Sequence, residues 1–421
     1  SLIVKMIGLI AGFGISIVLG RNIGSEGLGI INLATRIIDL ILIFALFGMD
    51  NVIRKEIAIA FERKNWQHIA NTIYTSLCLN IPFALLISII LILVAPWVSE
   101  YLFNENKLTL PLTIFIILLV PQVFSRILAS GINGFRKIWQ SNLVNATFSS
   151  LVTLLGFSIL LLNDIKITII NTAIIYGIGR LSTSLIIGLY WRHLFSFKDL
   201  KLVMLTKPML KVALPLLIVS STSLIASSAD TVMLALMSDI SEVGLYNVGL
   251  RLGMVTSIIH IITMSSLTPK VASLYHENKI TELQTMVQRI TMGLGAMGLI
   301  SLIIFILFGN YFLSFWGSEF EEAYWILILI ASAQFVNISS GATGTILIMT
   351  GNEKVVGYLT SFTALLNIFL NFILIPKFGG LGAAIGTGST LIIQNIIQFI
   401  LVKRKVGIYT IGFKSIKLIK N

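Results

Sequence analysis

The chain has 421 residues, of which 56% are hydrophobic and only 11% are charged, and its net charge is +12. Mean hydropathy is +0.95, which excludes an ordinary soluble domain, because such a domain needs a more highly charged surface while a bilayer-embedded chain is solvated by lipid. The basic residues lie between apolar runs and form no single stripe, so they indicate membrane-protein loops and no nucleic-acid partner. Cys78 is the only cysteine, and the sequence predicts no metal site.

Apolar runs of about 20 residues, each long enough to cross a hydrocarbon core of ~30 Å, recur along the whole chain. They predict twelve transmembrane helices in an all-α protein, at residues 2–20, 28–50, 70–97, 109–133, 140–162, 167–191, 209–236, 243–267, 287–313, 323–349, 355–375 and 380–402. The longest connections, near 192–208 and 269–286, are amphipathic and basic, which predicts interfacial helices. No connection is long enough to hold a soluble catalytic domain.

The loops on the two sides of these spans differ strongly in charge. With a cytoplasmic N-terminus, 22 lysines and arginines lie on the cytoplasmic side. The opposite side has only four, at Arg21, Lys107, Lys166 and Lys377, together with nine acidic residues. The positive-inside rule therefore predicts a multi-pass protein of the cell (inner or cytoplasmic) membrane with both termini in the cytoplasm.

An internal repeat relates the first six spans to the last six. Residues 29–36 and 244–251 both read G-x-x-N-x-x-x-R, at an offset of 215, and the same offset pairs Lys55 with Lys270 in the next loop. Six spans per repeat give the two halves the same orientation, a device of transporters. The predicted organisation is an N-terminal lobe at 1–197, a cytoplasmic linker at 198–208, a C-terminal lobe at 209–403 and a basic cytoplasmic tail at 404–421.

Charged residues inside the spans are costly and mark candidate functional positions. Four are arginines and three are aspartates: Arg36, Arg126, Arg180, Arg251, Asp39, Asp50 and Asp230. Asn32, Arg36 and Asp39 share one helical face, and Asn247 with Arg251 forms the equivalent face of the eighth span. The positive excess suits an anionic ligand, and guanidinium is well shaped for phosphate.

The predicted substrate-binding residues are accordingly Arg36, Arg251, Arg180, Arg126, Asn32 and Asn247, and the candidate ion-coupling residues are Asp230 and Asp39. No catalytic residue is predicted. Simpler alternatives stay open for several of these positions. Arg36 and Asp39 could form an ion pair within one helix, and Arg126 and Arg180 could reach lipid headgroups. Polar residues of the last two spans, such as Asn367 and Gln398, favour contacts between helices.

Three segments resemble a known family. Leu19–Gly29 reads L-G-R-N-I-G-S-E-G-L-G, close to the R-x-L-G-P-E-x-x-G pattern of polysaccharide and O-antigen repeat-unit flippases, with Ile23 and Ser25 in place of the usual Leu and Pro. Residues 230–234 with 243–246 resemble the seventh and eighth spans of these flippases. Residues 375–384 resemble their P-x-x-G-x-x-G-A-A segment before the twelfth span. The family belongs to the multidrug/oligosaccharidyl-lipid/polysaccharide exporter superfamily.

This resemblance implies a V-shaped bundle of two six-helix lobes around a central cavity, working by alternating access. It implies a polyprenyl-diphosphate-linked oligosaccharide as cargo, with Arg36 and Arg251 meeting the diphosphate. No cofactor is implied beyond possible coupling to H+ or Na+. The expected partners are this lipid-linked oligosaccharide and membrane lipids, with a polymerase and a ligase of the same pathway as further candidates.

Three other functions remain in view at this point. A multidrug cation antiporter of the same superfamily would share the fold, but a cationic drug prefers an acidic cavity. A membrane-embedded polysaccharide polymerase or ligase would be an enzyme, and such enzymes have longer external loops than this chain. A flippase for a lipid II-type peptidoglycan precursor is a subtype of the favoured hypothesis, a flippase for a lipid-linked oligosaccharide.

Overall fold

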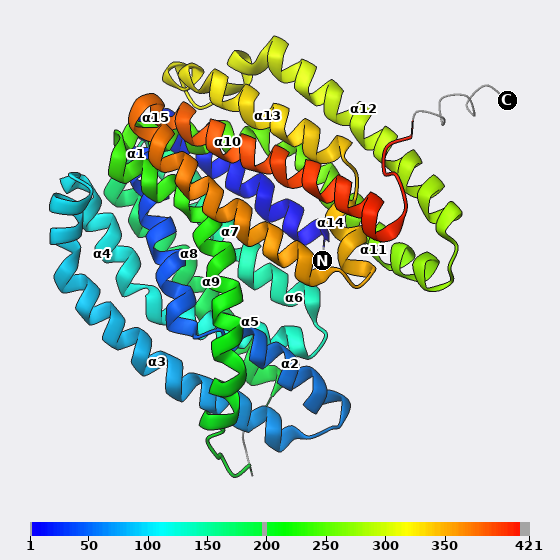
Figure 1. The fold of residues 1–421 in the computed structure, drawn as a ribbon. Helices are drawn as coiled ribbons and strands as arrows, with labels where there is room; N and C mark the ends of the chain where they lie inside the picture. The colour runs from blue at the N-terminus through cyan, green and yellow to red at the C-terminus, as the bar shows by residue number, and fades with distance from the viewer. Residues whose placement is uncertain (1, 196–199, 413–421) are drawn as a thin grey trace. The chain divides into compact units, whose positions relative to one another are not determined.

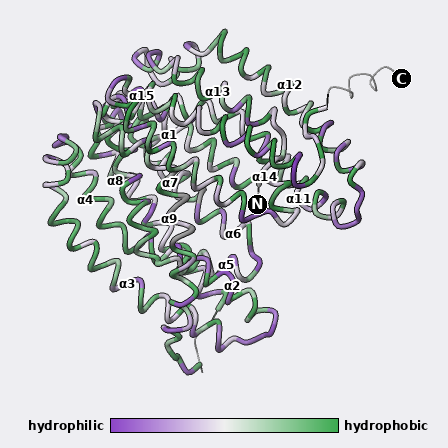
Figure 2. The backbone as a smooth tube through the Cα atoms, in the orientation of Figure 1, coloured by the Kyte–Doolittle hydropathy of each residue, from purple (hydrophilic) through white to green (hydrophobic). Residues whose placement is uncertain are grey.

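The computed structural model describes residues 2–195 and 200–412. Within these residues it contains fifteen α helices and no strand (Figure 1). Helices suit a bilayer because they satisfy their backbone hydrogen bonds internally. Apolar residues follow almost the full length of most helices (Figure 2), and polar side chains mark several helix starts. Asn65 and Thr168 each accept a hydrogen bond from a backbone N–H three residues later, at 3.0 and 3.2 Å.

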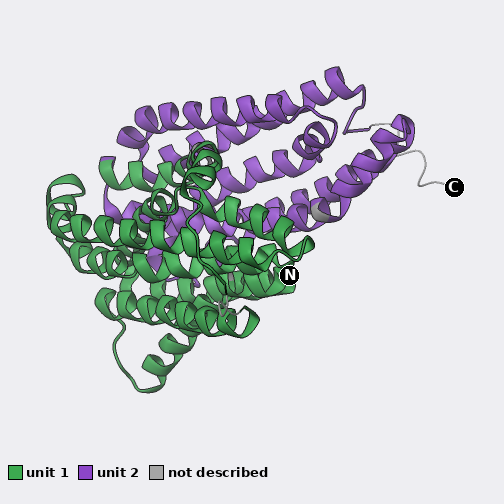
Figure 3. Cartoon of the chain, turned by 90° about the horizontal axis from the view of Figure 1, so that it is seen from below, with its two compact units in different colours: residues 1–236 green, residues 237–421 purple. Residues whose placement is uncertain are grey.

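The described residues form two compact units, unit 1 at Ser1–Leu236 and unit 2 at Met237–Asn421 (Figure 3). The helices of unit 1 are α1 (Leu2–Leu46), α2 (Met49–Glu62), α3 (Trp66–Trp97), α4 (Thr109–Ile117), α5 (Leu119–Gly134), α6 (Ile138–Asn142), α7 (Phe148–Leu162), α8 (Ile169–Leu194) and α9 (Thr206–Met237). Those of unit 2 are α10 (Ile240–Gly253), α11 (Val255–His276), α12 (Ile280–Leu313), α13 (Tyr324–Ser339), α14 (Thr343–Met349) and α15 (Glu353–Val406). The predicted lobes differ from these units in assigning α9 to the second half, and that assignment stays a prediction.

Two of the long helices each contain two predicted spans. Helix α1 is interrupted at Gly24, which has φ 68° and ψ −174°, and the chain folds back there (Figure 1). Helix α15 is interrupted in the same way at Gly379, with φ 53° and ψ −132°. Both conformations are open to glycine and strained for other residues. The carboxylate of Glu242 accepts a hydrogen bond from the backbone N–H of Gly380 at 2.9 Å, which stabilises the start of the second arm of α15.

By length and composition, six helices of the described chain can cross a membrane, or nine when each bent pair counts as one span. The bent pairs are α4 with α5, α6 with α7, and α10 with α11, at 41–44°. Two of the nine, α1 and α15, contain two arms each, so the nine correspond to eleven predicted spans. Helix α9 corresponds to the remaining predicted span, at 209–236. The all-α polytopic fold is therefore confirmed.

The prediction of an interfacial helix near 192–208 is wrong for the described residues. Residues 200–205 are not helical and lie against α3. There the backbone N–H of Val203 donates to the Asn71 side chain at 3.0 Å, and that of Leu205 donates to Thr75 at 2.8 Å. The Asn71 and Thr75 side chains thus accept the hydrogen bonds that backbone carbonyls would accept if residues 200–205 were helical. Residues 196–199, and 413–421 of the predicted basic tail, lie outside the described residues.

Candidate functional site: a cationic cavity in unit 1

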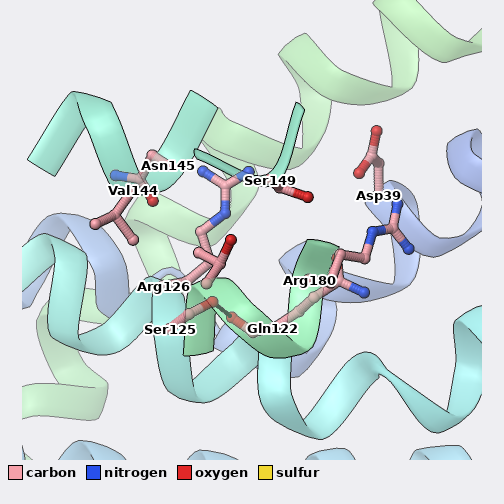
Figure 4. A pocket seen from close by; sticks show the side chains of 9 residues that line it. Asp39, Gln122, Ser125, Arg126, Val144, Asn145, Ser149 and Arg180 are labelled. Atoms are coloured by element: carbon pink, nitrogen blue, oxygen red, sulfur yellow. Dashed lines mark hydrogen bonds between the residues drawn. The ribbon is translucent and has the colours of Figure 1, made fainter. Parts of the chain in front are cut away.

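A cavity of about 160 Å³ lies among four helices of unit 1 and is lined mostly by polar side chains (Figure 4). Its lining residues are Asp39 of α1, Gln122, Ser125 and Arg126 of α5, Val144 and Asn145 of the turn before α7, Ser149 of α7, and Arg180 and Thr183 of α8. Two arginines and one aspartate leave this lining with a net positive charge. A cavity of this volume is large enough for several water molecules or a small charged group.

Local backbone features place these side chains. Gln122 and Arg126 are one turn apart on α5, so they share a face. Residues Leu143–Thr147 form a single π-helical turn, a widening of the helix that recurs at functional sites and here carries Asn145. The hydroxyl of Thr147 donates to the carbonyl of Val4 at 2.7 Å, which ties this turn to the start of α1.

Gly179 permits the close packing that brings Arg180 to the cavity. A Cβ at Gly179 would lie 2.6 Å from the Thr153 hydroxyl and 2.8 Å from the carbonyl oxygen of Ser149, both on α7. The missing side chain therefore lets α8 lie directly against α7, with the next residue, Arg180, at the cavity.

We expect Gly179→Ala to push α7 and α8 apart and to lower the free energy of unfolding by about 1–3 kcal/mol, the usual range for overpacking. Thermal unfolding of the purified protein in detergent measures this effect. Gly293→Ala is the matched control, because a Cβ at this helical glycine meets nothing within 4 Å. Equal midpoint temperatures of thermal unfolding for Gly179→Ala and Gly293→Ala would show that α8 tolerates a wider separation from α7.

The two arginines of the cavity have different surroundings. The Arg180 guanidinium lies over the Phe115 ring, 4.5 Å from its centroid, and its Nη1 atom is fully buried with no hydrogen-bond partner among the described residues. Arg126 is more exposed and extends toward Asn145 and Ser149 (Figure 4). Among the described residues, neither arginine has a carboxylate within 4.0 Å. A buried guanidinium without an ion pair is costly, so the site is poised to accept an anion.

Asp39 is the acidic residue of this cavity. Figure 4 shows the Arg180 guanidinium extending toward the Asp39 carboxylate, although no ion pair within 4.0 Å joins them. Arg36 precedes Asp39 by three residues on α1, and these two also form no ion pair within that distance. The intrahelical Arg36–Asp39 pair considered from sequence is therefore not formed in the structure. Arg180 contacts Phe115 and lines the cavity, in contrast to the alternative in which it reaches lipid headgroups.

The structure thus brings Asp39, Arg126 and Arg180 together and leaves the other predicted residues outside the cavity lining. Asn32 and Arg36 are half-buried on α1, two turns and one turn before Asp39, respectively. On α10, Arg251 is exposed, and the Asn247 side chain donates to the carbonyl of Val243 in its own helix at 2.8 Å. Asp230 is buried on α9.

Sequence reasoning missed the polar residues that complete the cavity, namely Gln122, Ser125, Asn145, Ser149 and Thr183. A usable signal existed in the spacing of four between Gln122 and Arg126 and between Asn145 and Ser149, within otherwise apolar spans. The polar residues of α15 do join helices, as predicted. Gln398 accepts from Thr343 of α14 at 3.0 Å, and Asn395 accepts from Ser340 at 2.9 Å.

Comparisons with known proteins agree with this architecture. Residues 1–275 match the family model described as polysaccharide biosynthesis protein, and residues 215–373 match the model described as MatE. The probable low-salt glycan biosynthesis flippase Agl15 of Haloferax volcanii is 21% identical over 386 residues, which are 90% of this chain and 77% of that protein.

Two solved structures share the fold at low sequence identity. An inward-facing multidrug resistance MATE family transporter of the MOP superfamily gives a TM-score of 0.78 at 14% identity, covering 97% of this chain and 98% of its own. The lipid II flippase MurJ, in an inward closed conformation, gives 0.76 at 15% identity, covering 95% and 86%. With more than half of its residues matched by the first family model, the chain belongs to the polysaccharide biosynthesis protein family.

Proposed function

We propose that this protein is a flippase that moves a polyprenyl-diphosphate-linked oligosaccharide from the cytoplasmic to the outer leaflet by alternating access, for cell-surface polysaccharide biosynthesis. The observation that carries the proposal is the cationic cavity of unit 1, where Arg126 and Arg180 have no carboxylate within 4.0 Å in the described chain. The names of Agl15, a probable low-salt glycan biosynthesis flippase, and of MurJ, a lipid II flippase, support this proposal.

The chemistry of such a substrate fits guanidinium groups. A diphosphate diester offers several oxygens and two negative charges, and an arginine can donate two parallel hydrogen bonds to a phosphate. The lipid tail stays in the bilayer while the polar headgroup crosses. No covalent bond changes, so the proposed activity is transport and not catalysis. Arg36, Arg251, Asn32 and Asn247 stay as further proposed ligands of the headgroup, and Asp230 and Asp39 as proposed residues for coupling to H+ or Na+.

The proposed setting is the cell membrane, with both termini in the cytoplasm and with lobes at 1–197 and 209–403. The 22-to-4 distribution of basic residues supports this orientation. A polymerase and a ligase that act on the flipped oligosaccharide are proposed partners, because those reactions consume the product of translocation. Labelling with a membrane-impermeant thiol reagent tests the orientation. Lys107→Cys should be labelled in intact cells, and Lys354→Cys only after the cells are opened.

A multidrug cation antiporter is the second candidate, favoured by the MatE match and by the fold of the MATE transporter. The charge of the cavity opposes it, because a cationic drug would meet two arginines and one aspartate. Vesicles containing the purified protein separate the two functions. A flippase exposes a labelled polyprenyl-diphosphate sugar to an external modifying reagent and accumulates no ethidium, and an antiporter does the reverse.

Within this assay we expect Arg251→Ala to abolish headgroup translocation while the protein remains folded in the membrane, since loss of a guanidinium removes a phosphate donor. Arg289→Ala, an equally exposed arginine on α12, is the matched control and should flip at the wild-type rate. Translocation by Arg251→Ala at the wild-type rate would remove Arg251 from the proposed binding residues.

A further inference from the structure

Asp39 is the one carboxylate in the lining of the cationic cavity. Among the described residues, the cavity lining brings two arginines and no second acid to it. Arg126 of α5 and Arg180 of α8 line the same cavity as Asp39, and Arg36 lies one turn before Asp39 on α1. The segments α4, α6 and α7 and the π-helical turn before α7 have no titratable side chain. Any anion that enters the cavity therefore meets the two arginines and the one aspartate of its described lining.

The spacing of these charges has a direct consequence for binding. The Arg180 guanidinium extends toward Asp39 in Figure 4, but the two side chains form no ion pair within 4.0 Å, so the carboxylate weakens the positive field without occupying the donors of Arg180. A diphosphate bound to Arg126 and Arg180 would then lie several ångströms from a like charge. At an effective dielectric of about 20, two unit charges about 6 Å apart repel strongly enough to change affinity by roughly 100-fold, and water in the cavity reduces this to about tenfold.

We infer that Asp39 is an internal competitor of the transported diphosphate. It offsets part of the positive charge when the cavity is empty, and it repels the diphosphate when the cavity is filled. A transporter must release its cargo as well as bind it, and an all-arginine cavity would hold a diphosphate too tightly. Asp39 thus acts as a residue that sets affinity and permits release. The inference rests on the proposed flippase function, since it assumes a diphosphate ligand.

The first test measures binding of UDP-glucose, a soluble diphosphate diester that does not titrate near neutral pH, to the purified full-length protein by isothermal titration calorimetry. We expect Asp39→Asn to bind it about tenfold more tightly than the wild type and to flip the lipid-linked sugar more slowly at saturating substrate. A merely structural role would not tighten binding. The matched control is Asp50→Asn, because Asp50 lies outside the cavity and pairs with Arg54 at 3.1 Å; its affinity should equal that of the wild type.

A second measurement uses the unmodified protein, in case Asp39→Asn fails to fold. Arginine side chains in general stay protonated at accessible pH, whereas acidification protonates a carboxylate and removes its negative charge. Wild-type affinity for UDP-glucose should therefore rise as the pH falls. A flat or falling wild-type affinity overturns the inference.

The outcomes separate this inference from the proposed function. If the wild type binds UDP-glucose and Arg180→Ala does not, but Asp39→Asn binds equally or more weakly, then Asp39 is no competitor and the flippase proposal stands. If the wild type binds no diphosphate diester and translocates no lipid-linked sugar, both proposals fail together. Tighter binding with slower translocation in Asp39→Asn supports both.

Discussion

Replacing Arg180 by alanine is expected to lower the rate of headgroup translocation about 100-fold. The guanidinium lies over Phe115, and Arg180 lines the cavity with no carboxylate within 4.0 Å in the described chain, so its charge is available to a ligand. A charge-assisted hydrogen bond contributes about 1.5–3 kcal/mol, which corresponds to roughly 10- to 100-fold, and a bidentate contact lies at the upper end. The measurement is the initial rate of exposure of a labelled polyprenyl-diphosphate sugar in reconstituted vesicles.

Two variants make this result specific. Arg180→Lys keeps the charge but loses the planar fork, so it should retain more activity than Arg180→Ala and less than the wild type. Arg192→Ala removes an exposed arginine near the end of the same helix and should leave the rate unchanged. Thermal stability supplies an independent check. Arg180→Ala removes the contact with Phe115, so a moderately lower unfolding temperature is expected together with the loss of flipping. A lower unfolding temperature combined with normal flipping would make Arg180 a structural residue.

The second large effect is expected at the bend of α15. A Cβ at Gly382 would overlap the carbonyl oxygen of Leu374 and would lie 2.5 Å from the carbonyl carbon of Leu374 and 2.8 Å from the nitrogen of Ile375. These are backbone atoms of the facing arm, which cannot rotate away as a side chain can. Gly382→Ala should therefore open the bend and lower the free energy of unfolding by about 3 kcal/mol, the upper end for overpacking.

The measurement is the unfolding temperature in detergent, followed by size-exclusion chromatography after heating. Gly357→Ala is the matched control on the same helix, because a Cβ there meets nothing within 4 Å. Alanine also favours the helix relative to glycine, so this variant should be as stable as the wild type or slightly more stable. A Gly382→Ala protein with the stability of the control would show that the two arms of α15 separate easily.

Much of the architecture was predictable because a bilayer imposes a constraint along one dimension. A run such as 287–313 must be long and apolar to cross, and α12 at Ile280–Leu313 contains it. The predicted boundary between the last two spans, at 375–380, contains the bend at Gly379. Helix breaks inside spans were harder to foresee. Hydropathy does not mark the 44° bend between α4 and α5, although Pro121, in the first turn of α5, predicts a kink there because proline lacks a backbone N–H.

The candidate site was predictable only in part. Composition established that arginines exceed aspartates inside the spans, and hence that an anionic ligand is favoured. The pattern of one helix identifies which residues share its face, as with Gln122 and Arg126, but it does not say which other helix that face meets. The internal repeat predicted Arg36 and Arg251 as equivalent substrate-binding residues, whereas the cavity in unit 1 is lined by Arg126 and Arg180.

The sequence by itself determined that this is a polytopic helical membrane protein with strongly asymmetric loop charge and a positive excess in its spans, because hydropathy and charge are properties of each segment alone. Only the tertiary structure decided that Asp39, Arg126 and Arg180 meet in one cavity. Their meeting depends on the rotation and separation of helices, set by the close contact at Gly179 and by the π-helical turn at 143–147. Packing of this kind is decided between segments far apart in the chain, and no single stretch of sequence encodes it.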